Sequence, residues 1–221
     1  MRRFLLVLMV VAGSCAHVRT VAQREIASTV RLEITEKLTL GDKSVEGGGS
    51  CSGVAISNDL ILTAAHCAVA HVPPELAQVG VVGTIESITA FSYANQELCQ
   101  VDVVKVDVAL DLALLKARCW LPDSSPVGKY EPPSGSKVLS VGYPLGIEYP
   151  IMTDGYLTVT IHGGDLDGTV VTSFPVLPGN SGGPVFYDGA VVGIVSRGTP
   201  RSNHHVGFSA SWSSIRAFLK R

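Results

Sequence analysis

Ser181 lies in a segment whose neighbouring residues can bend the backbone sharply around one hydroxyl group. The segment from Leu177 to Phe186 reads LPGNSGGPVF, and half of its residues are glycine or proline. Such residues are typical of tight turns, so the segment could be a surface turn before a strand. It could also aim the serine hydroxyl and the neighbouring N–H groups at one point. Because a serine hydroxyl is a poor nucleophile at neutral pH, this second interpretation requires a base and a carboxylate elsewhere in the chain.

His66 is the strongest candidate for the base among the six histidines. It follows the apolar residues 61–65 and precedes Cys67, so the end of a buried strand would hold it rigidly. A packed histidine without chemistry is the alternative. Asp111 is the candidate acid, because it interrupts the apolar segment 108–115, where a carboxylate needs a hydrogen-bonding partner. A histidine N–H would be such a partner, and a simple turn between two strands is the alternative.

Three motifs together resemble those of the chymotrypsin-like serine peptidases. TAAHC occupies residues 63–67, DLALL residues 111–115 and GNSGGP residues 179–184, which is the family's order of His, Asp and Ser. The resemblance extends from about residue 30 to the C-terminus. It implies an all-β protein of two six-stranded antiparallel β-barrels of the chymotrypsin type with a C-terminal helix.

The same resemblance implies a role for each matching residue. His66 would be the general base, Asp111 the acid that orients it, and Ser181 the nucleophile of a serine endopeptidase that acts through an acyl-enzyme. The N–H groups of Gly179 and Ser181 would form the oxyanion hole, and the two glycines after Ser181 would let substrate pass close to the backbone. No cofactor and no metal is implied, and the substrate would be a protein or a peptide. The residues expected to contact it are Pro175, Ser196, Arg197, Gly198 and Val206.

Asn180 separates this chain from the family members that require cleavage for activity. Those members carry an aspartate directly before the nucleophile, and a new N-terminus pairs with it, whereas Asn180 has no charge. We therefore expect a site that forms without zymogen cleavage, as in HtrA-type and related bacterial or phage trypsin-like peptidases. Residues 138–146, VLSVGYPLG, resemble the opening of their second barrel. HtrA proteins usually carry a PDZ domain after the protease, and we expect none here because the sequence ends at Arg221.

Pro175 bears on cleavage specificity, that is, on the substrate residue after which the protein would cut. It stands six residues before the candidate nucleophile, where trypsin-type members place an acid at the base of the specificity pocket. Without that acid, we expect a small or aliphatic residue on the acyl side of the cleaved bond. Selection of an acidic residue by Arg197, or by His204 and His205, is the alternative.

The elements that would position these residues are mostly β-strands. The 23 glycines and 12 prolines, with many short apolar runs, favour a β-rich chain. A linker rich in proline and serine at residues 121–136 separates two halves. Before it we expect strands at 30–40, 54–56, 60–63, 101–109 and 112–117, and a glycine-rich turn at 45–50. After it we expect strands at 137–141, 157–161 and 169–174, and a hairpin of 184–187 and 190–195 around Asp188-Gly189.

The peptidase domain is expected to span residues 29–221. Its first barrel would cover about 29–120, its second barrel about 136–208, and its C-terminal helix about 211–220. The helix is indicated by a helical spacing of apolar residues, with Ser209 or Ser211 as a possible cap. These apolar residues are Trp212, Ile215, Phe218 and Leu219.

The five cysteines bear on both folding and location. If Cys15 is removed or lipidated, four remain, and an exported domain would join them in two disulfides with three possible pairings. The family resemblance implies a disulfide between Cys51 and Cys67 that pins the histidine loop. Cys99 and Cys119 lie at equal distances from the centre of a predicted hairpin, which would bring them opposite each other. Free buried thiols are the alternative for this second pair.

The N-terminal residues resemble a signal for export. Met1-Arg2-Arg3 is basic, residues 4–12 are apolar and small residues follow, which is the arrangement of a secretory signal peptide over residues 1–15. Residues 16–28 would then form a tether. The signal also resembles a bacterial lipoprotein signal, with Cys15 as the candidate for lipidation and membrane anchoring. We therefore expect an exported protein that is periplasmic, secreted or lipid-anchored, an uncleaved interfacial anchor being the alternative.

Two other functions are compatible with parts of the sequence. A non-catalytic binding or scaffold protein could retain the same fold. An α/β-hydrolase esterase would also contain the Gly-x-Ser-x-Gly pattern of residues 179–183, but there a helix follows the serine and the histidine comes last. Here residues 184–187 predict a strand, and His66 precedes Ser181. The formal net charge of −2 gives no reason to expect nucleic acid as a partner.

Overall fold

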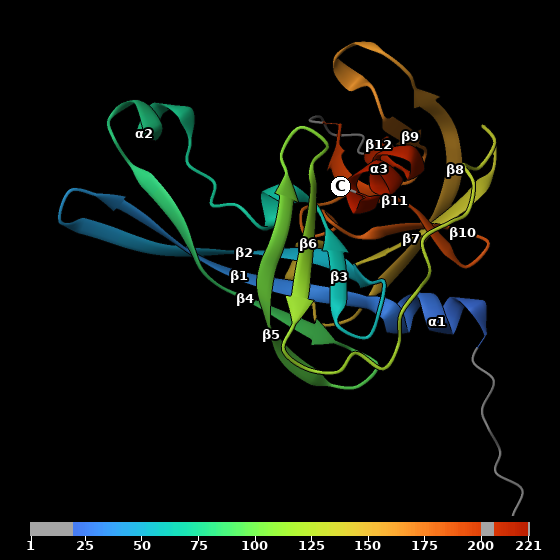
Figure 1. Ribbon diagram of the computed structural model, residues 1–221, viewed down its shortest axis with the longest axis horizontal. Helices are drawn as coiled ribbons and strands as arrows, with labels where there is room; N and C mark the ends of the chain where they lie inside the picture. Colours follow the sequence, from blue (N-terminus) through green and yellow to red (C-terminus); the bar gives the residue numbers. More distant parts are fainter. Residues whose placement is uncertain (1–19, 200–205, 221) are drawn as a thin grey trace, which may run out of the picture.

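Two closed β-barrels form the body of the protein in the computed structural model (Figure 1), which describes residues 20–199 and 206–220. Each barrel has six strands paired in antiparallel fashion, and one helix follows the second barrel. The predicted fold is therefore confirmed. The predicted signal peptide, including Cys15, lies outside the described residues. Within the described part of the chain, no helix combines the length and the apolar character that crossing a membrane would require.

The first barrel closes around aliphatic side chains that alternate along its strands. The strands are β1 (Thr29–Leu40), β2 (Lys43–Ala55), β3 (Leu60–Thr63), β4 (Val82–Ser92), β5 (Glu97–Asp107) and β6 (Leu112–Ala117). Around the barrel they follow the order β1-β2-β3-β6-β5-β4. Leu32, Ile61 and Leu112 are completely buried, and burial of each such side chain stabilises the fold by about 1.5–3 kcal/mol. The connection from β3 to β4 contains two short helices, η1 (Ala65–Cys67) and α2 (Pro74–Gln78).

The second barrel repeats this arrangement after an irregular connection. Its strands are β7 (Lys137–Gly142), β8 (Ile151–Ile161), β9 (Thr169–Thr172), β10 (Pro184–Tyr187), β11 (Ala190–Gly198) and β12 (Gly207–Ser211), in the order β10-β11-β12-β9-β8-β7. The short helices η2 (Pro144–Gly146) and η3 (Gly164–Leu166) lie in its loops. Asp188 and Gly189 both have positive φ, as a tight hairpin turn requires, so the predicted turn between β10 and β11 is confirmed.

The C-terminal helix α3 (Trp212–Lys220) packs on the second barrel and ends the described chain. The N–H of Ser214 donates to Oγ of Ser211 at 3.2 Å, so Ser211 is the cap. Ile215 and Phe218 are buried completely, which confirms that the predicted apolar stripe faces the protein.

A long arm extends from the first barrel where β1, β2 and β4 continue past it (Figure 1). The turn predicted for residues 45–50 is wrong, because these residues belong to β2 and pair with β1. The actual turn is Gly41-Asp42, where Gly41 has a φ of 58°. The glycines at 47–49 therefore lie in an extended strand, where they add no side chains to its surface.

The tether predicted for residues 16–28 is wrong for residues 21–28, which form the helix α1 (Val21–Ser28). Thr20 and Gln23 form a capping box: Gln23 N–H donates to Thr20 Oγ1 at 3.3 Å and Thr20 N–H donates to Gln23 Oε1 at 2.8 Å. The T-x-x-Q pattern of the sequence is the signal for this helix. Residues 16–19 lie outside the described chain.

Candidate active site

His66 and Asp111 come from two loops at one end of the first barrel. His66 lies in η1, directly after β3, and Asp111 lies in the turn between β5 and β6 with a φ of 51°. Nδ1 of His66 is 3.0 Å from each carboxylate oxygen of Asp111, and the backbone N–H of His66 donates to the same carboxylate at 3.1 Å. Because both carboxylate oxygens accept, Nδ1 carries the proton and Nε2 is left as a base.

The Asp111 carboxylate has a further donor from the second barrel. Oγ of Ser196, on β11, donates to it at 2.5 Å. Burial would raise the pKa of the Asp111 carboxyl, but the hydrogen bonds and charge of His66, together with the Ser196 hydroxyl, outweigh burial and lower this pKa below its ordinary value. Asp111 is therefore ionised and oriented at neutral pH.

Ser181 lies in the loop before β10, between the two barrels. Its carbonyl oxygen accepts from the N–H of Ser52, on β2, at 2.8 Å. Among the described residues, its hydroxyl donates to the carbonyl oxygen of Ser196 at 3.3 Å and makes no hydrogen bond to His66. Ser196 thus contacts both Asp111 and Ser181 and joins the two halves of the site. In unliganded structures, the hydrogen bond between a nucleophile and its base is often long and forms only with substrate.

The N–H groups of Gly179 and Ser181 have no hydrogen-bond partner in the described part of the chain. Gly179 has a φ of 94°, and a Cβ there would lie 2.4 Å from the carbonyl oxygen of Tyr143, so only glycine fits. Oγ of Ser52 donates to the carbonyl oxygen of Gly179 at 2.7 Å, which fixes the direction of that peptide group. Two unpaired donors beside a serine hydroxyl can bind an oxyanion.

Gly182 serves a different purpose from the one expected. A Cβ there would lie 2.0 Å from Oγ1 of Thr63 and 2.3 Å from the carbonyl oxygen of Ser52, both in the first barrel. Gly183 is also confined, with a Cβ position 2.8 Å from the carbonyl oxygen of Val141 in its own barrel and 3.2 Å from Cβ of Ser52 in the first barrel. These glycines allow the two barrels to meet closely, and the expectation that they make room for substrate is wrong. The physical reason is that they face the protein interior.

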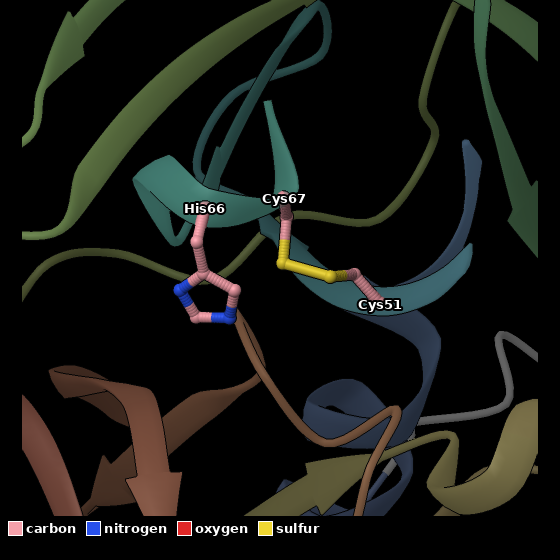
Figure 2. A group of neighbouring side chains, drawn as sticks. All are labelled: Cys51, His66 and Cys67. Atoms are coloured by element: carbon pink, nitrogen blue, oxygen red, sulfur yellow. A yellow bond between two sulfur atoms is a disulfide. The ribbon is translucent and has the colours of Figure 1, made fainter. Parts of the chain in front are cut away.

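Both disulfides have the predicted pairing. Cys51 on β2 is joined to Cys67, and Figure 2 shows this bond beside His66, which projects from the same short helix as Cys67. The second disulfide joins Cys99 on β5 to Cys119, just after β6, and so ties together the two strands that flank the turn of Asp111. The cluster of Cys51, His66 and Cys67 has the residue types of a metal site, but sulfurs joined in a disulfide are not thiolate ligands.

A cavity of about 550 Å³ opens beside His66 and Asp111. Of the residues expected to contact substrate, Ser196 and Arg197 line it, and the guanidinium of Arg197 lies 5.8 Å from the centre of the Phe208 ring. Pro175, Gly198 and Val206 are not among the described residues that line this cavity. Lining residues that the sequence analysis missed include His71, Asp165, Asp167 and Phe208. His204 and His205 lie outside the described residues.

Val176 is a further residue that the sequence analysis missed. It is buried, and it lies between Gly198 and Gly207: a Cβ on Gly198 would be 3.0 Å from its carbonyl oxygen, and one on Gly207 would be 2.9 Å from its Cγ2. Val176 therefore fills space beside β11 and β12 that the two glycines leave open. Its position next to Pro175 is the signal that could have identified it.

Comparison with known proteins agrees with this architecture. Over 180 residues the chain is 29% identical to protease Do-like 4 of Arabidopsis thaliana, a match that covers 79% of the chain and 32% of that protein. It is 38% identical over 117 residues, or 48% of the chain, to a probable periplasmic serine endoprotease of Marinomonas, of which the match covers 24%. The chain thus spans a third or less of these relatives.

A solved structure and a family model also match this architecture. A protease of M. tuberculosis in its active form superposes with a TM-score of 0.67 at 21% identity, covering 90% of this chain and 82% of that one. At this identity the likeness shows the fold. The model of the trypsin-like peptidase domain matches residues 51–194, which run from the first disulfide cysteine to β11. This match covers more than half of the chain, and the protein therefore belongs to the trypsin-like peptidase domain family.

Proposed function

We infer that the protein is a serine endopeptidase in which Ser181 is the nucleophile, His66 the general base and Asp111 the acid that orients it. The observation that carries this proposal is the pairing of His66 Nδ1 with both oxygens of Asp111 at 3.0 Å, next to a loop with two unpaired N–H groups. The names of the relatives, a protease and a serine endoprotease, support it.

In the first half of the reaction, Oγ of Ser181 leaves the Ser196 carbonyl and attacks the carbonyl carbon of the scissile bond. Nε2 of His66 accepts the hydroxyl proton, and the ionised Asp111 stabilises the resulting imidazolium. The peptide oxygen becomes an oxyanion that the N–H groups of Gly179 and Ser181 bind. His66 then gives its proton to the leaving amine, and an acyl-enzyme remains.

In the second half, His66 removes a proton from a water molecule, which attacks the acyl carbon. The same two N–H groups bind the second oxyanion, and the proton returns to Ser181 as the acid product leaves. Loss of one oxyanion donor in such sites lowers the rate by about 100- to 1,000-fold. Both halves therefore depend on the shape of the loop 179–181, in which Ser52 holds the peptide group between the two that carry these donors.

Activity without zymogen cleavage is part of the proposal. Asn180 carries no charge that would need a new N-terminus. Its N–H donates to the carbonyl of Leu177 at 3.0 Å, and its carbonyl accepts from the N–H of Gly183 at 2.9 Å. These bonds, with that of Ser52 to Gly179, support a loop that is formed in the uncleaved chain.

We propose a small or aliphatic residue on the acyl side of the cleaved bond. Pro175 provides no acid for a lysine or arginine side chain, and Val176 narrows the space between Gly198 and Gly207. Selection of an acidic residue by Arg197 is less favourable, because Asp165 and Asp167 line the same cavity. Cleavage of a peptide panel after lysine or arginine would contradict this preference.

Export is the location that we propose, with Cys15 as a candidate lipid anchor. The basic and apolar N-terminal residues support it, as does the word periplasmic in the name of the Marinomonas relative. Labelling with radioactive palmitate in a bacterial host, with Cys15→Ala as the control, tests the anchor. Label that is equal in both proteins would contradict lipidation at Cys15.

A fluorophosphonate probe tests the catalytic proposal. Such a probe reacts with an activated serine, so we expect the folded, uncleaved protein to be labelled and the Ser181→Ala variant to remain unlabelled. Heat-denatured protein serves as the control for non-specific reaction, and N-terminal sequencing of the labelled chain shows whether it was cleaved within the domain. Failure of the wild-type protein to react would favour the scaffold interpretation.

A further inference from the structure

The outer edge of β2 is open over most of the arm. From Lys43 to Ser50, β2 pairs with β1 on one side, and it meets β3 only at Val54 and Ala55. No other strand of the described chain covers the edge over residues 43–50, and residues 43–49 are exposed. An open edge presents unpaired N–H and C=O groups to any extended chain that can reach it.

The backbone groups that face outward can be identified from Ser52. Its N–H donates to Ser181 and its carbonyl accepts from Thr63, so both point away from β1. The register of β1 with β2 runs without a shift from Thr29↔Val54 to Leu40↔Lys43. Because successive residues of an antiparallel strand face opposite neighbours, every second residue before Ser52 also points outward. These residues are Ser50, Gly48, Glu46 and Ser44.

This open edge begins at the candidate active site. Ser52 contacts both Ser181 and Gly179, and Cys51 is bonded to the cysteine that follows His66. Ser50 lies next to the η2 loop, since a Cβ on Gly146 would be 3.5 Å from its Cβ. An extended chain that leaves Ser181 on this side therefore meets Ser50 first and then the rest of the arm.

The residues of the edge favour pairing through the backbone. Residues 47–49 are all glycine, so no side chain selects or rejects the partner there. Edges that proteins protect carry charged side chains, especially lysine, or proline or bulges. Residues 47–50 contain no charged residue and no proline, and the ladder with β1 has no bulge. A partner held by main-chain bonds is recognised by its extended shape more than by its sequence.

We propose that the outer edge of β2 from Ser50 to Ser44 binds the leaving-group side of an extended polypeptide substrate by strand addition. This inference rests on the proposed peptidase function and deepens it. The substrate class is an unfolded or extended segment that continues for about seven residues past the scissile bond, the length needed to reach Ser44 at about 3.3 Å per residue.

The first test compares peptides that share one acyl side and differ in the length of the leaving side. We expect kcat/KM of the wild-type protein to rise with length until the peptide reaches Ser44, by about three- to tenfold for each strand hydrogen bond gained. Equal kcat/KM for short and long peptides would overturn the inference and leave the proposed function intact. Absence of hydrolysis of every peptide would instead count against the function.

A second test uses the fact that every second residue of the β2 edge points outward. Two series of long peptides are N-methylated at alternate leaving-side residues, one series offset from the other by one residue. Methylation at residues that face β2 removes donors and should lower kcat/KM to that of short peptides. The offset series should keep the kcat/KM of unmethylated long peptides. Fluorescence anisotropy with the Ser181→Ala variant gives the same comparison without hydrolysis. Equal loss in both series would overturn the inference.

A variant at Glu46 tests whether the effects of peptide length and N-methylation arise at the edge of β2. Glu46→Pro removes an outward N–H without removing a bond to β1, a position at which edge strands accept proline. It should abolish the gain from long leaving sides and leave kcat/KM of short peptides unchanged. Glu46→Ala, which removes the same side chain but keeps the N–H, should behave like the wild type. Retention of the length effect in folded Glu46→Pro would contradict the proposal.

Discussion

In the first barrel, His66 and Asp111 are held by two disulfides and by hydrogen bonds between neighbouring loops. In the second barrel, Ser181 lies on a loop that no disulfide of the described chain reaches. The carbonyl oxygen of Ser181 accepts a hydrogen bond from the N–H of Ser52 in the first barrel. One half of the site is thus held covalently within its own barrel. The other half obtains its shape from contact between the barrels.

This difference predicts where each half is vulnerable. Small changes in the contact between barrels should displace Ser181 and the oxyanion donors, because Gly182 fits against Thr63 and Ser52 of the first barrel with no space to spare. Loss of a covalent bond should act mainly on the stability of the first barrel.

Replacement of Gly182 by alanine should have the largest effect. Its Cβ would overlap Oγ1 of Thr63 and the carbonyl of Ser52, so the loop of Ser181 must move. Since a displacement of about 1 Å can cost about 100-fold in rate, we expect fluorophosphonate labelling to slow by at least about that factor.

Gly135→Ala is the matched control for this substitution. Gly135 has a φ of 85°, close to the 79° of Gly182, but a Cβ there would meet nothing within 4 Å. It should lose about 1 kcal/mol of stability from backbone strain alone and keep the labelling rate. Equal labelling by the two variants would show that the barrel contact does not control the loop.

Removal of the disulfides should have the next largest effect. Each bond closes a loop of 16 or 20 residues, so replacing either pair by serine should lower the free energy of unfolding by about 3 kcal/mol. Loss of the bond between Cys51 and Cys67 should also slow peptide hydrolysis, because it adjoins His66. Loss of the bond between Cys99 and Cys119 should slow it much less, because this bond joins the ends of β5 and β6 that lie away from the turn of Asp111. Urea denaturation and kcat/KM at a temperature where both variants are folded measure this; equal slowing would contradict the distinction.

A smaller effect concerns the carboxyls that the two barrels bury. Glu25 of α1 packs against the second barrel, and burial raises the pKa of its carboxyl above the ordinary value. The titratable groups that line the same cavity are Lys137, Asp154 and Asp188, and Lys137 is paired with Asp154 at 2.9 Å. Among the described residues the Glu25 carboxyl has no partner. At neutral pH its ionisation therefore costs stability.

Glu25→Gln should accordingly stabilise the protein at pH 7, by on the order of 1 kcal/mol, or a rise in Tm of about 2–4 °C. Because the folded-state pKa is raised, the cost in the wild type grows as pH rises through that pKa, and it disappears below about pH 4.3. The variant and the wild type should then unfold alike in acid.

Asp111→Asn provides the opposite case. The pKa of Asp111 is lowered, so its contribution to stability is present above the ordinary pKa of about 3.9 and is lost as pH falls through the folded-state value. Thermal unfolding of both variants between acid and neutral pH measures these slopes. A Glu25→Gln variant that is less stable than the wild type at pH 7 would contradict the analysis of α1.

The parts of the molecule that could be predicted from sequence depend on local patterns. The hairpin turn at Asp188-Gly189 and the cap at Ser211 follow from residue types within a few positions. The strands β4 and β12 were not predicted. Four of the five residues of β12 are glycine, serine or alanine, and its pairing with β9 and β11 depends on segments distant in the chain. Val176 was missed for a related reason, since its importance arises from Gly198 and Gly207, which are distant in the chain.

Three motifs in a fixed order were enough to indicate the family from the sequence, and with it the two barrels, and the positions of the cysteines favoured the pairing that the structure has. These features depend on residue types and spacing, which any alignment of motifs can read. Three features became evident in the folded protein alone: Ser196 bridges Asp111 and Ser181, Gly182 faces Thr63, and β2 has an open edge beside the site. The physical reason is that each of these depends on a distance between segments far apart in the chain, which local residue preferences do not specify.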